Sequence, residues 1–381
     1  MNIISMKIVQ KYTDSSKIIK TILVKNNNEI ESQLSSFSDI PREYRSLFNE
    51  DHFKDNLSIK NLSRHFTEET ANKIRAKHEI SLDITIEKTS IAQLLLSGES
   101  NIQHELFETE YFSIIYNVCK ENSYVTSRYK IFEKLDRELY LKFLSELDVE
   151  VDFLLNTEKQ DVDLSIFKNY VFTSQAAAIF FHEGVGHFLE CDYYKISPFQ
   201  DMSQIISGLS VYENYLIKND EKDQLNDVIK NDIKLVENGK IINLLSNRFF
   251  SNVFDINNSG NAIFCNNPTL VRMRSMCVEA EEEDSVSYLS DENTCFIEEI
   301  VNGDMNPLYG YFSIVVLKAR NSSGDYYKPF TLHFDIRDYK SYSVRSLGEK
   351  EKYTGLCGKL NELVPVKIEV PPILLSLNKR S

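Results

Sequence analysis

The sequence predicts an α+β fold in two domains, a mixed α/β N-terminal domain over residues 1–165 and a β-rich C-terminal domain over residues 166–381. The chain of 381 residues, 42% of them hydrophobic and 26% charged, is long enough for two globular cores. Helical and alternating hydrophobic patterns are mixed in the first part, whereas frequent turn sequences interrupt the second. A short apolar helix that carries a histidine motif is expected at the junction of the two domains.

The N-terminal domain contains both kinds of hydrophobic periodicity. Apolar residues recur at alternate positions in two stretches separated by Glu121-Asn122-Ser123, which is typical of a hairpin. A later stretch has leucines and a phenylalanine three and four residues apart, the pattern of an amphipathic helix. The expected elements are helices at 40–53, 67–77 and 133–147, a strand at 80–86, and the hairpin strands at 111–120 and 124–132.

The C-terminal domain has the short strands and turns of an antiparallel or mixed sheet structure. Turn signals include Asn238-Gly239, Asn258-Ser259-Gly260-Asn261 and Asn302-Gly303. Between such turns, apolar and β-branched residues gather in runs of strand length. The expected strands are 240–245, 311–319, 330–336 and 364–370.

Composition excludes several classes of partner. The formal net charge of -14 argues against nucleic-acid binding, which needs a basic surface. No stretch approaches the ~20 consecutive apolar residues of a membrane-spanning helix, so we expect no membrane partner. The N-terminus lacks the pattern of a secretory signal, and the six cysteines form no CxxC pair. We therefore expect a cytoplasmic protein with reduced thiols.

The most informative segment is the run from Phe181 to Glu190, which contains His182, Glu183 and His187. Two imidazoles and a carboxylate are the groups that can hold a zinc-type ion and activate water beside it. The histidines are five residues apart, and at ~100° per residue this spacing separates them by about 140° on a regular α-helix. A local i to i+5 widening, a π-bulge, would bring them together, and we expect Gly184 and Gly186 to permit it.

The residues before this motif predict a buried helix. Residues 176–181 are uncharged and apolar, and Thr173 or Ser174 can serve as the N-cap. Histidines and carboxylates directly after such a helix would be costly to bury without partners, and a metal ion would satisfy them. The alternative is that His182 and His187 are surface or hydrogen-bonded core residues at a helix end.

A candidate third ligand lies near the C-terminus. Cys357 stands between Leu356 and Gly358, and its thiolate would complete a His2Cys site with an open fourth position. Such an open position is typical of catalytic zinc sites. The alternative is a buried thiol in a turn, and spacing alone cannot connect position 357 with position 187.

These motifs together resemble the TldD/PmbA metalloprotease family, in particular its metal-bearing TldD-type members. The run His182 to Glu190, with Asp192, is similar to the family's HExxxH signature and its trailing Leu-Glu-x-Asp. Gly355-Leu356-Cys357-Gly358-Lys359 and Val364-Pro365-Val366 are similar to its closing motifs. The resemblance covers about residues 170–370, and the N-terminal part is short for the family and divergent.

The resemblance implies a peptidase that acts on short or unfolded peptides, with a specific precursor peptide as a possible target. His182, His187 and Cys357 would bind Zn2+, or another divalent ion such as Fe2+. Glu183 would be the general base. Peptides would bind as an added strand. The family also implies a heterodimer with a PmbA/TldE-type paralogue, a homodimer being the alternative. The alternative function is a non-catalytic partner subunit with a structural metal.

Two departures from the family pattern concern the site. In the segment 271–276 only Arg272 and Met273 match, and Arg272 is the candidate substrate contact in this segment. Cys191 replaces a small residue before Asp192. It would be a spare thiol near the metal or a residue that fills the same space.

Overall fold

The computed structural model describes residues 3–12, 17–25, 28–33, 68–97, 103–121, 123–197, 202–213, 223, 227–263, 270–283, 286–306, 308–359 and 362–378. The chain divides into two compact units, Met1–Thr157 and Glu158–Ser381. The fold is mixed α/β and rich in sheet, as predicted. The domain boundary expected between residues 165 and 166 stays a prediction, because a division of the chain by contacts does not test which part folds alone. Among the described residues no helix is both long and apolar enough to cross a membrane.

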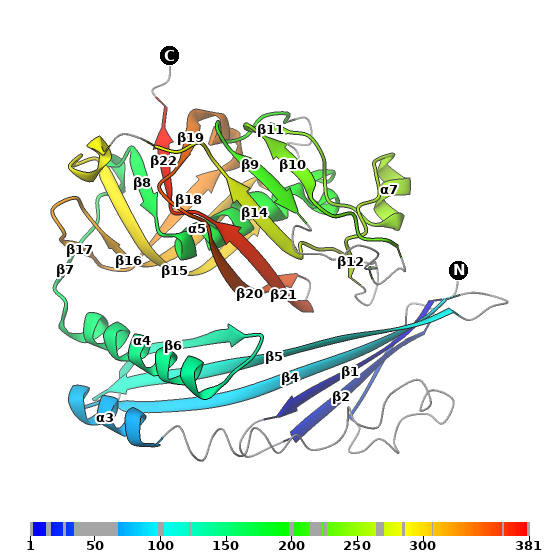
Figure 1. Ribbon diagram of the computed structural model, residues 1–381, viewed down its shortest axis with the longest axis horizontal. Coiled ribbons are helices and arrows are strands. Elements are labelled where there is room, and N and C mark those ends of the chain that lie inside the picture. The colour runs from blue at the N-terminus through cyan, green and yellow to red at the C-terminus, as the bar shows by residue number, and fades with distance from the viewer. Residues whose placement is uncertain are drawn as a thin grey trace. The chain divides into compact units, whose positions relative to one another are not determined.

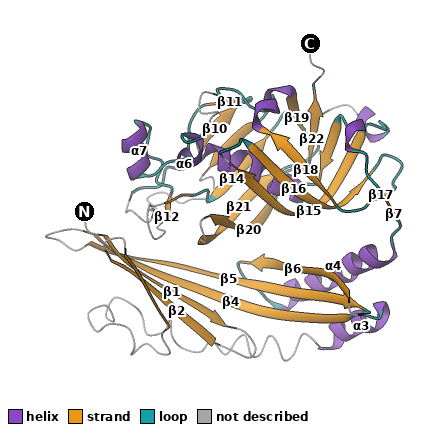
Figure 2. Ribbon diagram, turned by 180° about the vertical axis from the view of Figure 1, so that it is seen from behind, coloured by secondary structure: helices purple, strands orange, loops and turns teal. Residues whose placement is uncertain are grey.

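The N-terminal unit is built on one antiparallel sheet of six strands in the order β3-β2-β1-β4-β5-β6. Figure 2 shows these strands side by side, with two helices at one end of the long β4 and β5. The elements are β1 Ile3–Tyr12, β2 Lys17–Lys25, β3 Asn28–Gln33, α3 Glu68–His78, β4 Ser81–Ser97, β5 Gln103–Lys120, β6 Ser123–Phe132 and α4 Arg137–Asn156.

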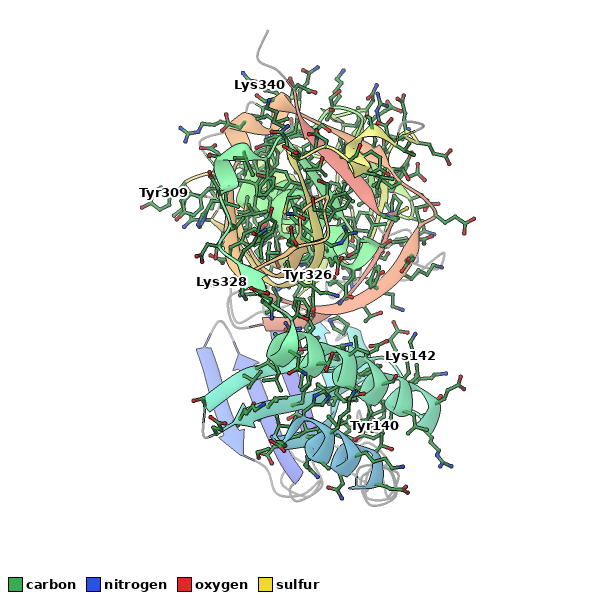
Figure 3. All side chains as sticks on the ribbon, turned by 90° about the vertical axis from the view of Figure 1, so that its left-hand side faces the viewer. Tyr140, Lys142, Tyr309, Tyr326, Lys328 and Lys340 are labelled. Carbon is green, nitrogen blue, oxygen red and sulfur yellow. The ribbon has the colours of Figure 1, made fainter. Side chains whose placement is uncertain are left out.

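The helix α4 covers the core of this unit. It begins after Asp136, whose side chain accepts a hydrogen bond from the Leu139 N–H, the usual role of an N-cap carboxylate. Its apolar face packs on α3, β4 and β5, where Phe143 meets Tyr116 edge to face at 5.4 Å between ring centroids. On the same helix the side chain of Tyr140 is buried, whereas that of Lys142 is exposed and projects away from the helix (Figure 3).

Most predicted elements of this unit are confirmed. The expected hairpin is β5 and β6, with Lys120 opposite Ser123, and the helices expected at 67–77 and 133–147 are α3 and α4. No element was predicted for residues 3–33, where β1, β2 and β3 lie. Lysine, asparagine and serine interrupt the apolar alternation there, so the strand period is obscured. The helix expected at 40–53 lies outside the described residues.

The C-terminal unit holds two larger sheets, one small sheet and several short helices. Its strands are β7 Lys159–Gln160, β8 Asn169–Phe172, β9 Ser210–Glu213, β10 Ile233–Glu237, β11 Lys240–Ile241, β12 Ala262–Ile263, β13 Leu270–Val271, β14 Ser275–Glu279, β15 Thr294–Asn306, β16 Tyr311–Arg320, β17 Tyr326–Tyr327, β18 Phe330–Asp335, β19 Tyr342–Ser346, β20 Glu351–Lys359, β21 Glu362–Val370 and β22 Ile373–Leu377. Its α-helices are α5 Ser174–Phe181, α6 Cys191–Tyr194 and α7 Arg248–Phe254, with a π-helical turn at His182–Gly186 and 3-10 turns at Leu164–Ile166, His187–Leu189, Ser287–Leu289 and Ile336–Ser341.

The two larger sheets enclose α5. One has the order β19-β22-β8-β15-β16-β17-β7 with β18 on β16, and the other the order β11-β10-β9-β14-β21-β20. Helix α5 contacts β8 and β15 of the first sheet and β20 and β21 of the second (Figure 1). Phe180, near the end of α5, packs against Phe172, Phe312 and Phe334. The helix before the histidine motif is therefore held in the core of this unit, close in sequence to the division between the units.

The strands predicted for this unit are confirmed at 311–319, 330–336 and 364–370. The strand expected at 240–245 ends at Ile241, because the N–H groups of Ile242 and Asn243 both donate to the Leu235 carbonyl and the ladder stops there. The turn expected at Asn302-Gly303 was wrong, since both residues lie within β15. None of the five cysteines in the described ranges forms a disulfide.

Strand β9 ends at a buried carboxylate. Glu213 has no exposed surface, and its Oε1 accepts hydrogen bonds from the backbone N–H groups of Arg274 and Ser275 at the start of β14. Its Oε2 has no hydrogen-bond partner in the described part of the chain. Burial raises the pKa of Glu213 to about 7.

This pKa predicts an unusual pH dependence of stability. Because the folded-state pKa lies above the ordinary value of 4.5, the folded chain binds more protons than the unfolded chain between pH ~4.5 and ~7. The contribution of Glu213 to the free energy of unfolding should therefore fall as pH rises through this window, by on the order of 3 kcal/mol. Denaturant unfolding at several pH values, with a chelator present, measures it.

Glu213→Gln is the matched variant, because the amide keeps the size and the acceptor of the protonated acid. We expect it to remove most of this pH-dependent loss. An unchanged pH profile in the variant would show that other groups cause it.

Candidate metal centre

The two histidines of the motif are brought together by the predicted π-helical turn. Helix α5 begins at its N-cap Thr173, whose hydroxyl accepts a hydrogen bond from the Ala176 N–H at 3.3 Å. After Phe181 the helix widens over His182–Gly186, and the N–H of His187 donates to the carbonyl of His182, five residues back. The two imidazole rings then lie 4.8 Å apart between centroids. The spacing of five is therefore accommodated by the i to i+5 bond.

The glycines of this turn are needed for space. Gly186 has right-handed helical angles, φ -59° and ψ -53°, which any residue adopts. A Cβ on Gly184 would stand 2.5 Å from the ring of Phe312, and one on Gly186 would overlap the sulfur of Met273. The glycines therefore permit the turn, as expected, and they do so by leaving space for Phe312 and Met273. The turn itself is closed on one side by the Tyr339 hydroxyl, which donates to the Gly184 carbonyl at 2.6 Å.

Cys357 joins the two histidines. It lies on β20, 170 residues beyond His187, and its sulfur is 3.1 Å from His187 Nε2. One ligand atom from each of His182, His187 and Cys357 lies within 4.8 Å of the other two, and all three residues are buried. Among the described residues, these three are the possible metal ligands whose ligand atoms converge on one point. Cys191, which the sequence offered as a spare thiol near the metal, does not belong to this group.

The arrangement fits a zinc-type ion. Both ring nitrogens of His182 are buried without a hydrogen-bond partner in the described part of the chain. A buried imidazole in this state is rare unless an ion or a water satisfies it. Two imidazole nitrogens and a thiolate form one of the ligand sets that Zn2+ takes at catalytic sites, and they leave the fourth position of a tetrahedron open.

The electrostatics of the cluster favour a thiolate. Burial disfavours the charged form of Cys357, but the imidazoles of His182 and His187 outweigh it and lower its pKa to about 5. Burial also disfavours a charged His187, but the carboxylate of Glu190 and the sulfur of Cys357 raise its pKa to about 10. Without a metal, a thiolate at Cys357 is therefore paired with a charged imidazole at His187, which must release its proton when an ion binds.

Glu183 is the most accessible member of the motif. Its side chain is 19% exposed, and its Oε2 lies 3.9 Å from His187 Nε2. Burial raises its pKa, while the two imidazoles oppose this rise. Gly303 on β15 lies directly behind it, since a Cβ there would come within 3.2 Å of the Glu183 carboxyl carbon. Sequence reasoning missed Gly303, for which a glycine inside a strand is the usual signal of close approach.

A layer of charged residues lies behind the ligands. Glu190 Oε2 is 3.1 Å from His187 Nδ1 and 2.7 Å from Lys359 Nζ. Lys359 also reaches Asp192 at 2.8 Å, and both side chains are buried. The sequence showed these residues in motifs but gave no reason to pair them.

The structure places Arg272 within the protein interior. The residue has no exposed surface, and its Nη2 donates to the Cys357 carbonyl at 2.6 Å. Its guanidinium is thus held against the strand that carries Cys357, and a contact with substrate stays a prediction.

The packing around the π-helical turn makes a prediction for its glycines. Gly184→Ala should lower the free energy of unfolding by about 1–3 kcal/mol, because the new methyl group meets the rigid, buried ring of Phe312. Gly186→Ala should cost less, since the flexible thioether of Met273 can move aside. Denaturant unfolding of the metal-free variants tests this order, and the reverse order would contradict the packing argument.

Comparisons with known proteins agree with this architecture. Residues 169–333 match the family model of the PmbA/TldA metallopeptidase C-terminal domain. The fold is similar to TldE from Thermococcus kodakarensis, with a TM-score of 0.61 and 11% identity over 99% of this chain and 95% of that chain. It is also similar to a proposed modulator of a DNA gyrase from Thermotoga maritima, with a TM-score of 0.56 and 11% identity over 99% of this chain and 94% of that chain.

At this identity the structural similarities show the fold alone. No curated protein matches the sequence. The match to the family model covers the histidine motif, β15 and most of β18, and it names a metallopeptidase domain. Over residues 169–333 the chain therefore carries a domain of the PmbA/TldA metallopeptidase C-terminal type.

Proposed function

We propose that this chain is a metal-dependent peptidase that hydrolyses short or unfolded peptides. The observation that carries the proposal is the convergence of His182, His187 and Cys357 beside the partly exposed carboxylate of Glu183. The metallopeptidase family of the C-terminal domain supports the same reaction class.

The three converging residues would hold the ion, and their donor set suits Zn2+, with Fe2+ as the alternative. When bound there, such an ion lowers the pKa of a coordinated water and polarises the scissile carbonyl. Neither ring nitrogen of His182 has a hydrogen-bond partner of normal geometry among the described residues, so one of them is available to the ion.

Glu183 would act as general base and then as general acid. Its carboxylate is near the ligand atoms and reaches solvent, so it can take a proton from the attacking water and return it to the leaving amine. Burial raises its pKa above the ordinary value, which makes the carboxylate a stronger base for the proton of the water. Gly303 leaves the room that its side chain needs.

We base the proposed substrate and the proposed partner on the family resemblance. A peptide would bind as an added strand through its backbone, which favours unfolded chains over folded ones. A precursor peptide is the proposed target, and a TldE-type paralogue is the proposed partner, with a second copy of the chain as the alternative. We propose that Arg272 supports the β20 strand instead of contacting substrate, because its side chain is buried against Cys357.

Glu183→Gln tests the mechanism. The amide cannot accept the proton, so hydrolysis of an unfolded peptide should fall by about 10²–10⁴-fold while the bound zinc per chain stays unchanged. Mass spectrometry of the peptide products and elemental analysis of the protein measure the two quantities.

Glu292→Gln is the matched control, because this exposed glutamate is more than 60 residues from each ligand in sequence and should leave both quantities unchanged. Peptide hydrolysis that survives in Glu183→Gln would refute the role of Glu183. Zinc binding by the unaltered chain and its partner without any hydrolysis would instead favour a non-catalytic subunit with a structural metal.

A further inference from the structure

Lys359 occupies an unusual position at the end of β20. Its side chain is 1% exposed, and its ammonium group lies 2.7 Å from Glu190 and 2.8 Å from Asp192. It also donates to the Val271 carbonyl at 3.2 Å and lies 3.8 Å from the centre of the Tyr193 ring. A buried lysine is costly unless such partners satisfy it, so its position is tightly defined.

The carboxylate of Glu190 connects Lys359 to His187, one of the three candidate metal ligands. Its Oε2 lies 2.7 Å from Lys359 Nζ and 3.1 Å from His187 Nδ1, within hydrogen-bond distance of both. Its Oε1 accepts a hydrogen bond from the Met273 N–H at 3.1 Å. When the imidazole of His187 is neutral and donates from Nδ1 to Glu190, its lone pair is on Nε2, and this atom faces the sulfur of Cys357. Such carboxylate–histidine pairs fix the ring orientation of metal ligands.

Lys359 also acts on the opposite ligand through the backbone. It lies two residues beyond Cys357 on the same strand, so the two side chains point to the same face of β20. The bonds of Lys359 to Glu190 and Asp192 therefore hold β20 against the segment that follows the histidine motif. Arg272, which donates to the Cys357 carbonyl, supports the same strand.

We propose that Lys359 is a positioning residue for the metal centre, which fixes His187 through Glu190 and sets the register of Cys357 through β20. The inference rests on the metal site of the proposed function but not on its peptidase activity. Without the ammonium group, Glu190 and Asp192 would be two buried carboxylates close together, and Glu190 would lose its shortest hydrogen bond.

The test is the zinc affinity of the purified chain, measured by competition with a chromophoric chelator. Lys359→Met and Glu190→Gln should each weaken zinc binding by about 10–100-fold, the usual effect of removing such a support. Thermal unfolding of the metal-free proteins reports on folding separately. With Co2+ in place of zinc, the thiolate charge-transfer band should remain but shift, because the cysteine is kept and its geometry is changed.

Asp192→Asn is the matched control. Its amide oxygen can still accept the Lys359 hydrogen bond that anchors β20, and the residue does not contact His187, so we expect zinc affinity within about threefold of the unaltered chain even where stability falls. The double variant Lys359→Met with Glu190→Gln should weaken zinc binding by less than the product of the two single effects, because the two residues share the Lys359–Glu190 contact.

Two results would overturn the inference. Lys359→Met and Glu190→Gln could bind zinc as tightly as the unaltered chain, or Asp192→Asn could weaken binding as much as Glu190→Gln, which would mean a general structural role. If Lys359→Met does not fold, the comparison of Glu190→Gln with Asp192→Asn still decides. A chain that binds zinc in this manner but hydrolyses no peptide would refute the proposed function and leave the inference standing.

Discussion

The hydrogen bond from the His187 N–H to the His182 carbonyl is the interaction on which the site depends. A regular α-helix would direct the two imidazoles about 140° apart, and the wider turn brings them to one side. This turn is possible only where its neighbours leave room, and the ring of Phe312 and the thioether of Met273 take up the space that side chains at 184 and 186 would need. The geometry of the histidines is therefore set by the packing of α5 between two sheets as much as by the motif itself.

Charge is the second constraint, because the site buries more ionisable groups than a protein core usually holds. Glu190, Asp192, Lys359 and Arg272 are all buried, and each carboxylate of this group has a cationic partner. These residues come from three separated parts of the chain, near 190, near 272 and near 359. The same contacts that compensate the charges therefore also bring together the segments that carry His187 and Cys357.

Local features of this site could be predicted from the sequence. The five-residue spacing required an i to i+5 turn, and the apolar run after Thr173 predicted a buried, capped helix, because both depend on residues within about two turns of each other. The contact of Cys357 with His187 could not follow from spacing, and only the family resemblance suggested it. The pairing of Lys359 with Glu190 and the close approach of Gly303 to Glu183 could not be predicted either, because both contacts join residues that are far apart in the sequence. In the N-terminal unit, the strands at 3–33 were missed since polar residues mask their alternation, while the hairpin of β5 and β6 was found from its clean period of two.

The central claim is that His182, His187 and Cys357 bind one ion together. X-ray absorption at the zinc edge of the chain loaded with one equivalent of zinc tests this claim most directly. The account predicts a first shell with one sulfur at ~2.3 Å and two imidazole nitrogens at ~2.0–2.1 Å, and an oxygen or nitrogen in the remaining position. A first shell without sulfur, or one with two or more sulfur atoms, would contradict it.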